Sequence, residues 1–300
     1  MVNIYIISRH SGIVSRGVET YAQEIAKHLS KYHQVAILKS GFGVLSKKTG
    51  SIIISTGGRF ESVSLRIITW LRGQKLIIPG QSGLGFDDKL NLLCFPDRFI
   101  ALTKYQYDWA QNFNHFVKTE VIPNGVDLNI FKPSKSKPKV PTVGYVAALY
   151  PEKRQELLIR AVSQTNAKLI LVGKGPDERH LTDLCRKFLP NRFKIINAPH
   201  DQMPEIFQQF TVFAYPTVPW ESFGIAMLEA MACNIPVVAT DDPIRREIIG
   251  DAGLFASPSN LAEKINLALI NNWGSIPRHQ AEKYSWEEIV KKYLELFKEL

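Results

Sequence analysis

Residues 221–239 read Glu-Ser-Phe-Gly-Ile-Ala-Met-Leu-Glu-Ala-Met-Ala-Cys-Asn-Ile-Pro-Val-Val-Ala, and no other part of the chain is as informative. Glu221 and Glu229 flank a Phe-Gly turn, at the start of an apolar helix that precedes an apolar strand. Burying Glu229 among Ala, Met and Leu is costly unless it is paired or hydrogen-bonded, and the vicinal hydroxyls of a ribose are suitable partners. The free amides at the helix start suit a polar ligand beside Glu221. The pattern predicts a site for a polyhydroxylated sugar; the alternative is that both glutamates only complement the helix dipole.

This segment resembles the signature of the retaining glycosyltransferases of family four, which have the GT-B fold. The matching positions are Glu221, Phe223, Gly224, Glu229, Ala230, Ala232, Pro236, Val237 and Val238. Asn234 replaces the usual glycine, and asparagine also tolerates a left-handed backbone after a helix. Residues 121–133, 168–176, 246–253 and 284–287 also resemble the family. The resemblance implies an α/β protein with two Rossmann-like doubly wound domains that face a central cleft.

Short apolar runs alternate with helix-like segments along the chain, which is typical of parallel sheets with helices on both faces. Strands are expected at residues 2–7, 35–38, 52–54, 76–78, 99–102, 117–122, 142–147, 169–172, 193–196, 212–215 and 236–239. Residues 133–141 are rich in Pro and Lys without periodicity, which indicates a linker. We expect an N-terminal acceptor-side domain at residues 1–132 and a nucleotide-sugar-binding domain at residues 142–285. In the family, the last helix, here residues 286–300, crosses back to the N-terminal domain.

The resemblance implies a retaining hexosyltransferase that moves a hexose-type sugar from a nucleotide-diphosphate sugar to a glycan, a glycolipid or another hydroxyl acceptor. Glu229 would bind the ribose hydroxyls, and Glu221 would fix the sugar together with backbone amides. The predicted catalytic residues are Glu221 and Lys153. The predicted donor-binding residues are Glu229, Ser222, Phe223, Gly224, Ile225, Gly173 and Arg154.

Residues 144–154 resemble the phosphate clamp of the family. Lys153 falls on the clamp lysine and would neutralise charge that develops on the diphosphate. Ala148 stands where the family has an arginine, and Arg154, Arg16 and Arg9 are candidates for the missing cation. The chain has no Asp-x-Asp triad to hold a divalent ion, and the family is generally metal-independent. We therefore expect neither a metal nor another cofactor.

The loop from Ser8 to Gly17 joins the first expected strand to a helix. Its glycines allow close backbone approach, and the helix N-terminus favours an anion. Arg16, Gly17 and His10 are therefore predicted to lie beside the phosphates of the donor or beside the acceptor, with a plain turn as the alternative. His10 and His200 stand in strand-end loops, where they would face the cleft or lie on the surface.

The net charge of +9 is unevenly distributed. Residues 1–137 hold 18 Lys and Arg against 9 Asp and Glu, whereas residues 138–300 hold 19 of each. Such a basic region attracts anionic lipid, diphosphate substrates or nucleic acid. Scattered lysines that only solvate the surface explain part of the positive excess. A nucleic-acid partner is not expected, because no recognition module is present.

Residues 59–75 place Phe60, Val63, Ile67, Ile68 and Leu71 at helical spacing among basic residues. One interpretation is a core-packed helix with a basic outer face. The alternative is a membrane-surface helix that brings the protein to a lipid-linked acceptor.

The three widely spaced cysteines indicate reduced thiols, and no signal peptide or membrane span is expected. These features predict a cytoplasmic protein. Its basic N-terminal domain is in addition a candidate for peripheral association with the inner face of the membrane. Two other functions remain open at this point. One is a non-catalytic nucleotide-sugar-binding partner subunit, and the other is a nucleotide-sugar epimerase of the same fold.

Overall fold

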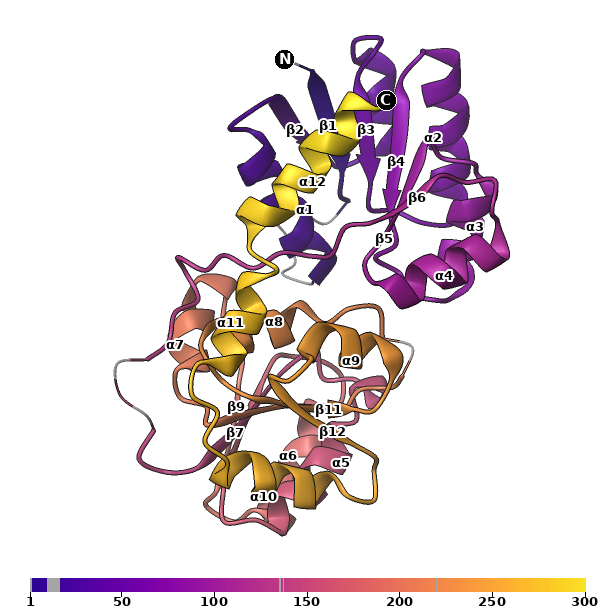
Figure 1. Cartoon of the computed structure of the whole chain (residues 1–300). Helices are drawn as coiled ribbons and strands as arrows, with labels where there is room; N and C mark the ends of the chain where they lie inside the picture. The colour runs from indigo at the N-terminus through magenta and orange to yellow at the C-terminus, as the bar shows by residue number, and fades with distance from the viewer. Residues whose placement is uncertain (1, 10–16, 135, 137, 220) are drawn as a thin grey trace. The chain divides into compact units, whose positions relative to one another are not determined.

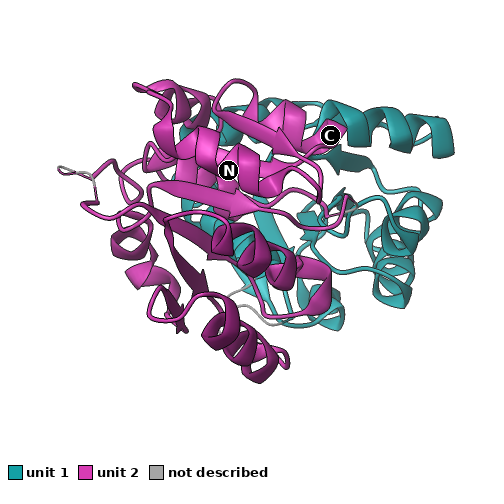
Figure 2. Ribbon diagram, turned by 90° about the horizontal axis from the view of Figure 1, so that it is seen from below, with its two compact units in different colours: residues 1–125, 286–300 teal, residues 126–285 magenta. Residues whose placement is uncertain are grey.

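A computed structural model describes residues 2–9, 17–134, 136, 138–219 and 221–300 (Figure 1). The chain divides into two compact units, which Figure 2 shows in different colours. The first unit comprises Met1–Gly125 and Trp286–Leu300, and the second comprises Val126–Ser285. The boundary between the two units lies after Gly125, earlier than the domain end expected at residue 132. The predicted linker at residues 133–141 therefore belongs to the second unit.

The first unit contains a parallel six-stranded sheet in the order β2-β1-β3-β4-β5-β6. Its strands are β1 (Asn3–Ile7), β2 (Gln34–Leu38), β3 (Ile52–Ser55), β4 (Lys75–Pro79), β5 (Arg98–Ala101) and β6 (Thr119–Val121). The central strands β3, β4 and β5 are almost wholly buried, as expected for parallel strands covered on both faces. The strand order reverses between β1 and β3, which makes that point the topological switch of the sheet.

The helices of the first unit follow its strands along the chain. They are α1 (Gly17–Leu29), the 3₁₀ helix η1 (Gly41–Ser46), α2 (Phe60–Leu71), α3 (Phe86–Leu93), α4 (Lys104–Phe113) and α12 (Trp286–Lys298). The last of these packs on α1, where the hydroxyls of Tyr21 and Tyr293 lie 2.7 Å apart in the buried interior. Trp286 is 1% exposed and closely approaches Gly125. The end of the chain is therefore an integral part of the first unit.

The return of α12 changes the charge distribution expected from the sequence. The first unit, with residues 286–300 included, holds 18 Lys and Arg against 12 Asp and Glu. The second unit holds 19 against 16. The positive excess is therefore shared by the two units, although the larger part lies in the first.

The second unit contains a parallel six-stranded sheet in the order β12-β11-β10-β7-β8-β9. Its strands are β7 (Thr142–Val146), β8 (Lys168–Val172), β9 (Phe193–Ile196), β10 (Val212–Tyr215), β11 (Val237–Thr240) and β12 (Gly253–Ala256). Strand β12 was not predicted from the sequence; it is a short strand at the edge of the sheet, beside β11. The two parallel sheets confirm the prediction of two doubly wound α/β halves.

The helices of the second unit include two short 3₁₀ segments at strand ends. They are η2 (Pro151–Lys153), α5 (Gln155–Ser163), α6 (Glu178–Phe188), η3 (His200–Gln202), α7 (Met203–Phe207), α8 (Ile225–Ala232), α9 (Pro243–Ile249), α10 (Leu261–Ile270) and α11 (Ile276–Glu282). Across the described part of the chain, no helix has both the length and the apolar character needed to cross a membrane.

The core-packed interpretation of residues 59–75 is wrong. Phe60, Val63, Ile67 and Leu71 are exposed, and only Ile68 of the five predicted core positions packs partly against the core. The helix turns a different face inward, on which Leu65 is the buried apolar residue.

Candidate functional site

The candidate site of the second unit lies where neighbouring parallel strands end at one edge of the sheet. Lys153 follows β7, Gly173 follows β8, Glu221 follows β10 and Arg245 follows β11. The strand order reverses between β7 and β10, and open α/β sheets bind ligands at such a switch point. The topology therefore brings predicted residues from distant parts of the sequence to one place.

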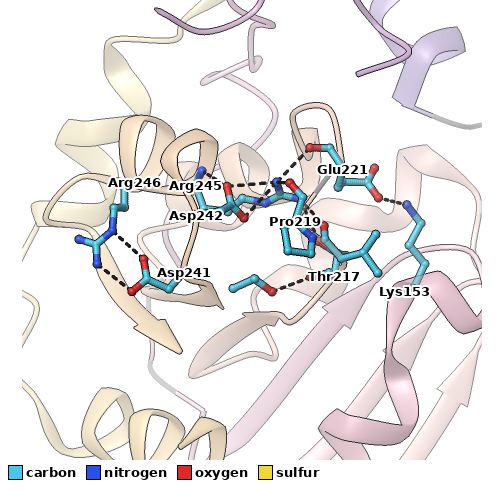
Figure 3. Close-up of polar contacts among 10 residues, drawn as sticks. Lys153, Thr217, Pro219, Glu221, Asp241, Asp242, Arg245 and Arg246 are labelled. Carbon is cyan, nitrogen blue, oxygen red and sulfur yellow. Dashed lines mark hydrogen bonds and ion pairs between the residues drawn. The ribbon is translucent and has the colours of Figure 1, made fainter. Parts of the chain in front are cut away.

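Lys153 and Glu221 form an ion pair between Nζ and Oε2 at the switch point (Figure 3). Their side chains are 23% and 21% exposed, so a ligand can reach both charges. The hydroxyl of Tyr145 donates to the carbonyl oxygen of Lys153 at 2.8 Å and fixes the backbone there. Burial, followed by the neighbouring Tyr215 and Glu221, raises the pKa of Tyr145 well above its usual value, so the hydroxyl keeps its proton. The structure thus joins the two predicted catalytic residues on a fixed backbone.

Arg245 of α9 is fully buried, and its guanidinium holds the loop that carries Glu221 (Figure 3). Nη1 donates to the carbonyl oxygens of Glu221 at 2.9 Å and Pro219 at 3.2 Å. Nη2 donates to Thr217 Oγ1 at 3.0 Å and to the carbonyl oxygen of Val218 at 3.3 Å. One side chain therefore holds residues 217–219 and Glu221 together.

Asp242 balances the buried charge of Arg245. Its Oδ2 lies 3.2 Å from Nη1 of Arg245, and its Oδ1 accepts the backbone N–H of Arg245 at 3.0 Å as the N-cap of α9. Burial raises the pKa of Asp242, while the charge of Arg245 opposes that rise. Such buried pairs contribute little net stability, but the loss of one partner is costly. The pair therefore makes the position of the loop depend strongly on Arg245.

Glu229 lies on α8 and is 6% exposed. Its Oε1 lies 3.0 Å from Nε2 of His200, the first residue of η3. This contact supplies the polar partner that a buried carboxylate requires. Of the two lone histidines singled out in the sequence, His200 is thus placed on a predicted donor-binding residue, and His10 lies outside the described residues.

Two left-handed backbone positions flank α8. Gly224 precedes the helix with φ of 87°, and a Cβ there would lie 2.9 Å from Met227 Cε and from Tyr215 Cε1. Asn234 follows the helix with φ of 60°, which confirms the left-handed conformation expected there. The Asn234 side chain donates to the carbonyl oxygen of Gly274 at 2.8 Å, a contact that glycine lacks.

The segment between Glu221 and α8 is anchored by a single apolar side chain. Phe223 is 1% exposed, and its ring packs edge-on against Tyr284 at a centroid distance of 6.3 Å. Ser222 and Ile225 on either side of it are partly exposed. Because the first turn of a helix leaves its N–H groups without intrahelical partners, this segment offers donors to a ligand.

The predicted phosphate clamp is only partly built. Gly173 has φ of 147°, and a Cβ on it would lie 2.0 Å from the carbonyl oxygen of Ala147, so only glycine fits this turn. Ala148 is exposed and brings no charge. Arg154 adopts a left-handed conformation with φ of 53°, and its side chain makes no ion pair within the described part of the chain. Of the candidate cations, Arg154 directly follows Lys153 in the chain, and Arg16 lies outside the described residues.

A separate cavity of about 400 Å³ lies at the ends of β1 and β3 in the first unit. Gly17 is exposed at the start of α1, and the next two residues, Val18 and Glu19, line the cavity. Arg16, like His10, lies outside the described residues. Glu19 is 7% exposed, and its Oε2 has no hydrogen-bond partner among the residues that the structure describes. A buried carboxylate oxygen without a partner is costly and suits a hydroxyl donor of a ligand.

Three residues of these sites were not predicted from the sequence: Arg245, Asp242 and Glu19. A signal for Arg245 exists, because Ile244, Arg245, Ile248 and Ile249 recur on one helical face, which places the arginine on the buried side. No sequence pattern predicts that Oε2 of Glu19 lacks a hydrogen-bond partner among the described residues, because this depends on which atoms pack around the side chain.

Comparison with known proteins agrees with this geometry. The sequence profile described as "Glycosyl transferases group 1" matches residues 127–287, which is more than half of the chain. An uncharacterised glycosyltransferase of Methanocaldococcus jannaschii is 31% identical over 51% of this chain and 44% of its own length. The O-antigen chain mannosyltransferase B of Escherichia coli is 31% identical over 34% of this chain and 28% of its own length. The chain thus spans less than half the length of both relatives.

Solved structures share the architecture over the whole chain. The Anabaena protein HepE, in complex with UDP-glucose, superposes with a TM-score of 0.82 at 20% identity and covers 100% of both chains. The sucrose-phosphate synthase of Thermosynechococcus elongatus gives a TM-score of 0.83 at 19% identity. This superposition covers 100% of the present chain and 99% of the synthase chain. The shared fold confirms the GT-B class. With the profile match over the second unit, it follows that the chain is a member of the glycosyl transferases group 1 family.

Proposed function

We propose that the protein transfers a hexose-type sugar from a nucleotide-diphosphate sugar to a hydroxyl acceptor, with retention of the anomeric configuration. The observation that carries this proposal is the ion pair between Lys153 and Glu221 at the switch point of the second sheet. A cation and a hydrogen-bond acceptor, both accessible and both fixed, suit a ligand that carries a diphosphate next to a sugar.

The donor would lie across the ends of β7, β8 and β10. Glu229, buried beside His200, would accept hydrogen bonds from the ribose hydroxyls. Glu221 and the N–H groups at the start of α8 would hold the sugar, and the tight turn at Gly173 would let the backbone approach the nucleotide.

Charge stabilisation of the leaving group would lower the barrier. As the bond between the anomeric carbon and the phosphate oxygen breaks, Lys153 would neutralise the negative charge on the diphosphate, with Arg154 beside it. The acceptor hydroxyl would give its proton to the leaving phosphate, and its oxygen would bond to the anomeric carbon on the same face. Neither a metal nor a protein nucleophile is needed in this proposal.

The cavity of the first unit is proposed to take the acceptor. The unpartnered Glu19 oxygen suits a sugar hydroxyl, and Arg9 and Arg59 line the same cavity. Arg9 faces Glu61 at 3.8 Å and Arg59 faces Asp87 at 3.0 Å, so a phosphate on the acceptor, as in a lipid-linked glycan, would have to replace one of these carboxylates.

Donor binding is tested by thermal stabilisation with UDP-, GDP-, ADP- and dTDP-sugars. UDP-glucose comes first, because the structural relative HepE binds it. A ligand at 100 times its Kd stabilises the folded state by about 2.7 kcal/mol. Glu229→Gln should weaken binding at least about tenfold, since it removes a charged hydrogen-bond acceptor. Glu263→Gln, at a side chain that is 61% exposed on α10, is the matched control and should bind like wild type.

Transfer is tested by the release of nucleotide and by NMR of the sugar product. An α-configured donor should yield an α-linked product or, with water as acceptor, an α-sugar before mutarotation. Binding without hydrolysis or transfer would favour a non-catalytic partner subunit. Conversion of the donor sugar to its epimer without an acceptor would favour the epimerase. Absence of binding to all four donor classes would refute the proposed donor site.

A further inference from the structure

Helix α2 in the first unit has its apolar face turned outward. Phe60, Ile67, Trp70 and Leu71 are 85%, 55%, 72% and 71% exposed. An amphipathic helix on a globular protein normally turns its apolar stripe toward the core. In α2 these exposed side chains share one face of the helix, whereas apolar residues on an ordinary surface are scattered singly.

The inward face of α2 is correspondingly polar. Its buried residues are Ser62, Leu65 and Thr69, of which only Leu65 joins the apolar core. The hydroxyl of Ser62 donates to Asn91 Oδ1 at 2.6 Å, so this face is held partly by hydrogen bonds. The orientation of α2 is therefore fixed, and its apolar stripe stays at the surface.

The 3₁₀ helix η1 lies beside α2 and carries further exposed apolar side chains. It packs against α2, and a Cβ on its first residue, Gly41, would lie 3.0 Å from Leu65 Cδ2. Phe42 and Leu45 of η1 are 69% and 50% exposed. We name the exposed side chains of Phe42, Leu45, Phe60, Val63, Ile67, Trp70 and Leu71 the α2 surface.

Basic residues lie at the end of the α2 surface where Trp70 and Leu71 stand. Nη2 of Arg72 donates to the carbonyl oxygen of Lys47 at 2.7 Å, which brings Arg72 and the pair Lys47-Lys48 together. None of these three cations pairs with a carboxylate in the part of the chain that the structure describes. In contrast, Arg66 on the flank of the helix is neutralised by Asp97 at 2.9 Å. The end of the α2 surface therefore carries uncompensated positive charge.

We propose that the α2 surface docks on an anionic lipid bilayer. Exposed aromatic and aliphatic side chains enter the headgroup region, and adjacent Lys and Arg attract anionic lipids, each worth about 1 kcal/mol near the surface. Lysines at the end of an exposed apolar helix face favour a membrane interface over a protein partner, because interfaces between proteins are depleted in lysine.

The α2 surface is continuous with the cavity at the ends of β1 and β3. Arg59 and Phe60 at the start of α2 line that cavity, so a bilayer under the helix would present lipid headgroups beside the opening. Docking itself needs no assumption about the reaction. The inference that docking delivers a lipid-linked acceptor rests on the proposed function.

Sedimentation with vesicles tests the docking directly, without any activity. Wild type is mixed with vesicles of phosphatidylcholine alone or with an equal share of phosphatidylglycerol, and light scattering gives its oligomeric state. We expect binding to the anionic vesicles that weakens as salt is raised. The double variant Trp70→Gln/Leu71→Gln should lower the partition coefficient at least about tenfold, since each side chain loses its apolar transfer.

Lys47→Gln/Lys48→Gln should lower binding to the anionic vesicles by about fivefold or more, and this loss should be absent with neutral vesicles. Ile270→Gln is the matched control, because this isoleucine is 78% exposed at the end of α10 in the other unit. It should bind like wild type.

Three outcomes would overturn the proposal. The first is that wild type fails to sediment with anionic vesicles. The second is that Trp70→Gln/Leu71→Gln binds as wild type does. The third is a wild-type dimer that the double variant converts to a monomer, without vesicle binding, which would assign the α2 surface to self-association. Donor binding measured in parallel separates each of these results from a failure of the proposed reaction.

Discussion

Replacing Arg245 with methionine should release the loop that carries Glu221. The change removes the donors to Thr217 and to three loop carbonyl oxygens, and it leaves Asp242 as a buried charge without its partner. Removing one partner of a buried ion pair costs about 3–5 kcal/mol. For a unit of this size, such a loss lowers Tm by an amount on the order of 10 °C.

The neighbouring arginine provides the matched control. Arg246 is of the same residue type on the same helix, but its side chain is 58% exposed and pairs with Asp241 at the surface (Figure 3). Arg246→Met should therefore leave stability nearly unchanged. Addition of Asp242→Asn to Arg245→Met should recover part of the loss, because the uncompensated charge is then gone and the amide oxygen can still cap α9.

Urea denaturation measures the free energy of unfolding, and hydrogen exchange followed by mass spectrometry locates the effect. Peptides that cover residues 217–224 should exchange faster in Arg245→Met and at the wild-type rate in Arg246→Met. Under the proposed function, Arg245→Met also lowers kcat more than it weakens donor binding, because Glu221 is displaced while Glu229 is not. A stability loss below about 1 kcal/mol together with unchanged exchange in the loop would refute the positioning role.

Three further predictions concern single buried contacts. Burial raises the pKa of Asp88 from 3.8 to about 8, so between these values the folded protein keeps a proton that the unfolded chain has lost. The free energy of unfolding should therefore fall by at most about 1.4 kcal/mol per pH unit from pH 5 to about 8 and level off above it, and Asp88→Asn should remove this slope from urea melts. Gly173→Ala should cost at least about 2 kcal/mol, since its Cβ would meet Ala147. Gly85→Ala meets nothing within 4 Å and should cost only about 0.5 kcal/mol, because alanine is a poorer N-cap for α3. Tyr145→Phe should cost about 1–3 kcal/mol, because the carbonyl oxygen at the end of η2 loses its buried partner; equal melting of Tyr145→Phe and wild type would contradict this.

Local pattern was sufficient for most of the fold. Runs such as Ile52–Ser55 and Val237–Thr240 are buried throughout and apolar up to their last residue, because parallel strands are covered on both faces, and helices separate these runs. The signature around α8 was equally local, and the left-handed Asn234 follows from its place directly after a helix. The edge strand β12 was missed because it is short and starts with glycine.

Periodicity alone could not decide which face of α2 is buried. The spacing of its apolar residues predicts an amphipathic helix, but the neighbours of the helix determine which side turns inward. Asn91 of α3 accepts a hydrogen bond from Ser62, and Leu65 enters the core, so a partly polar face was buried and the apolar stripe was left outside.

The sequence by itself determined the two α/β halves and the residue types of the donor site, because both depend on spacing within short segments. Only the tertiary structure decided that Lys153 meets Glu221, that His200 contacts Glu229 and that Arg245 bonds to the loop carrying Glu221. These contacts join loops from different strands, and the order of strands in the sheet determines which loops are neighbours. Strand order depends on the packing of the whole unit, so no single segment of the chain encodes it.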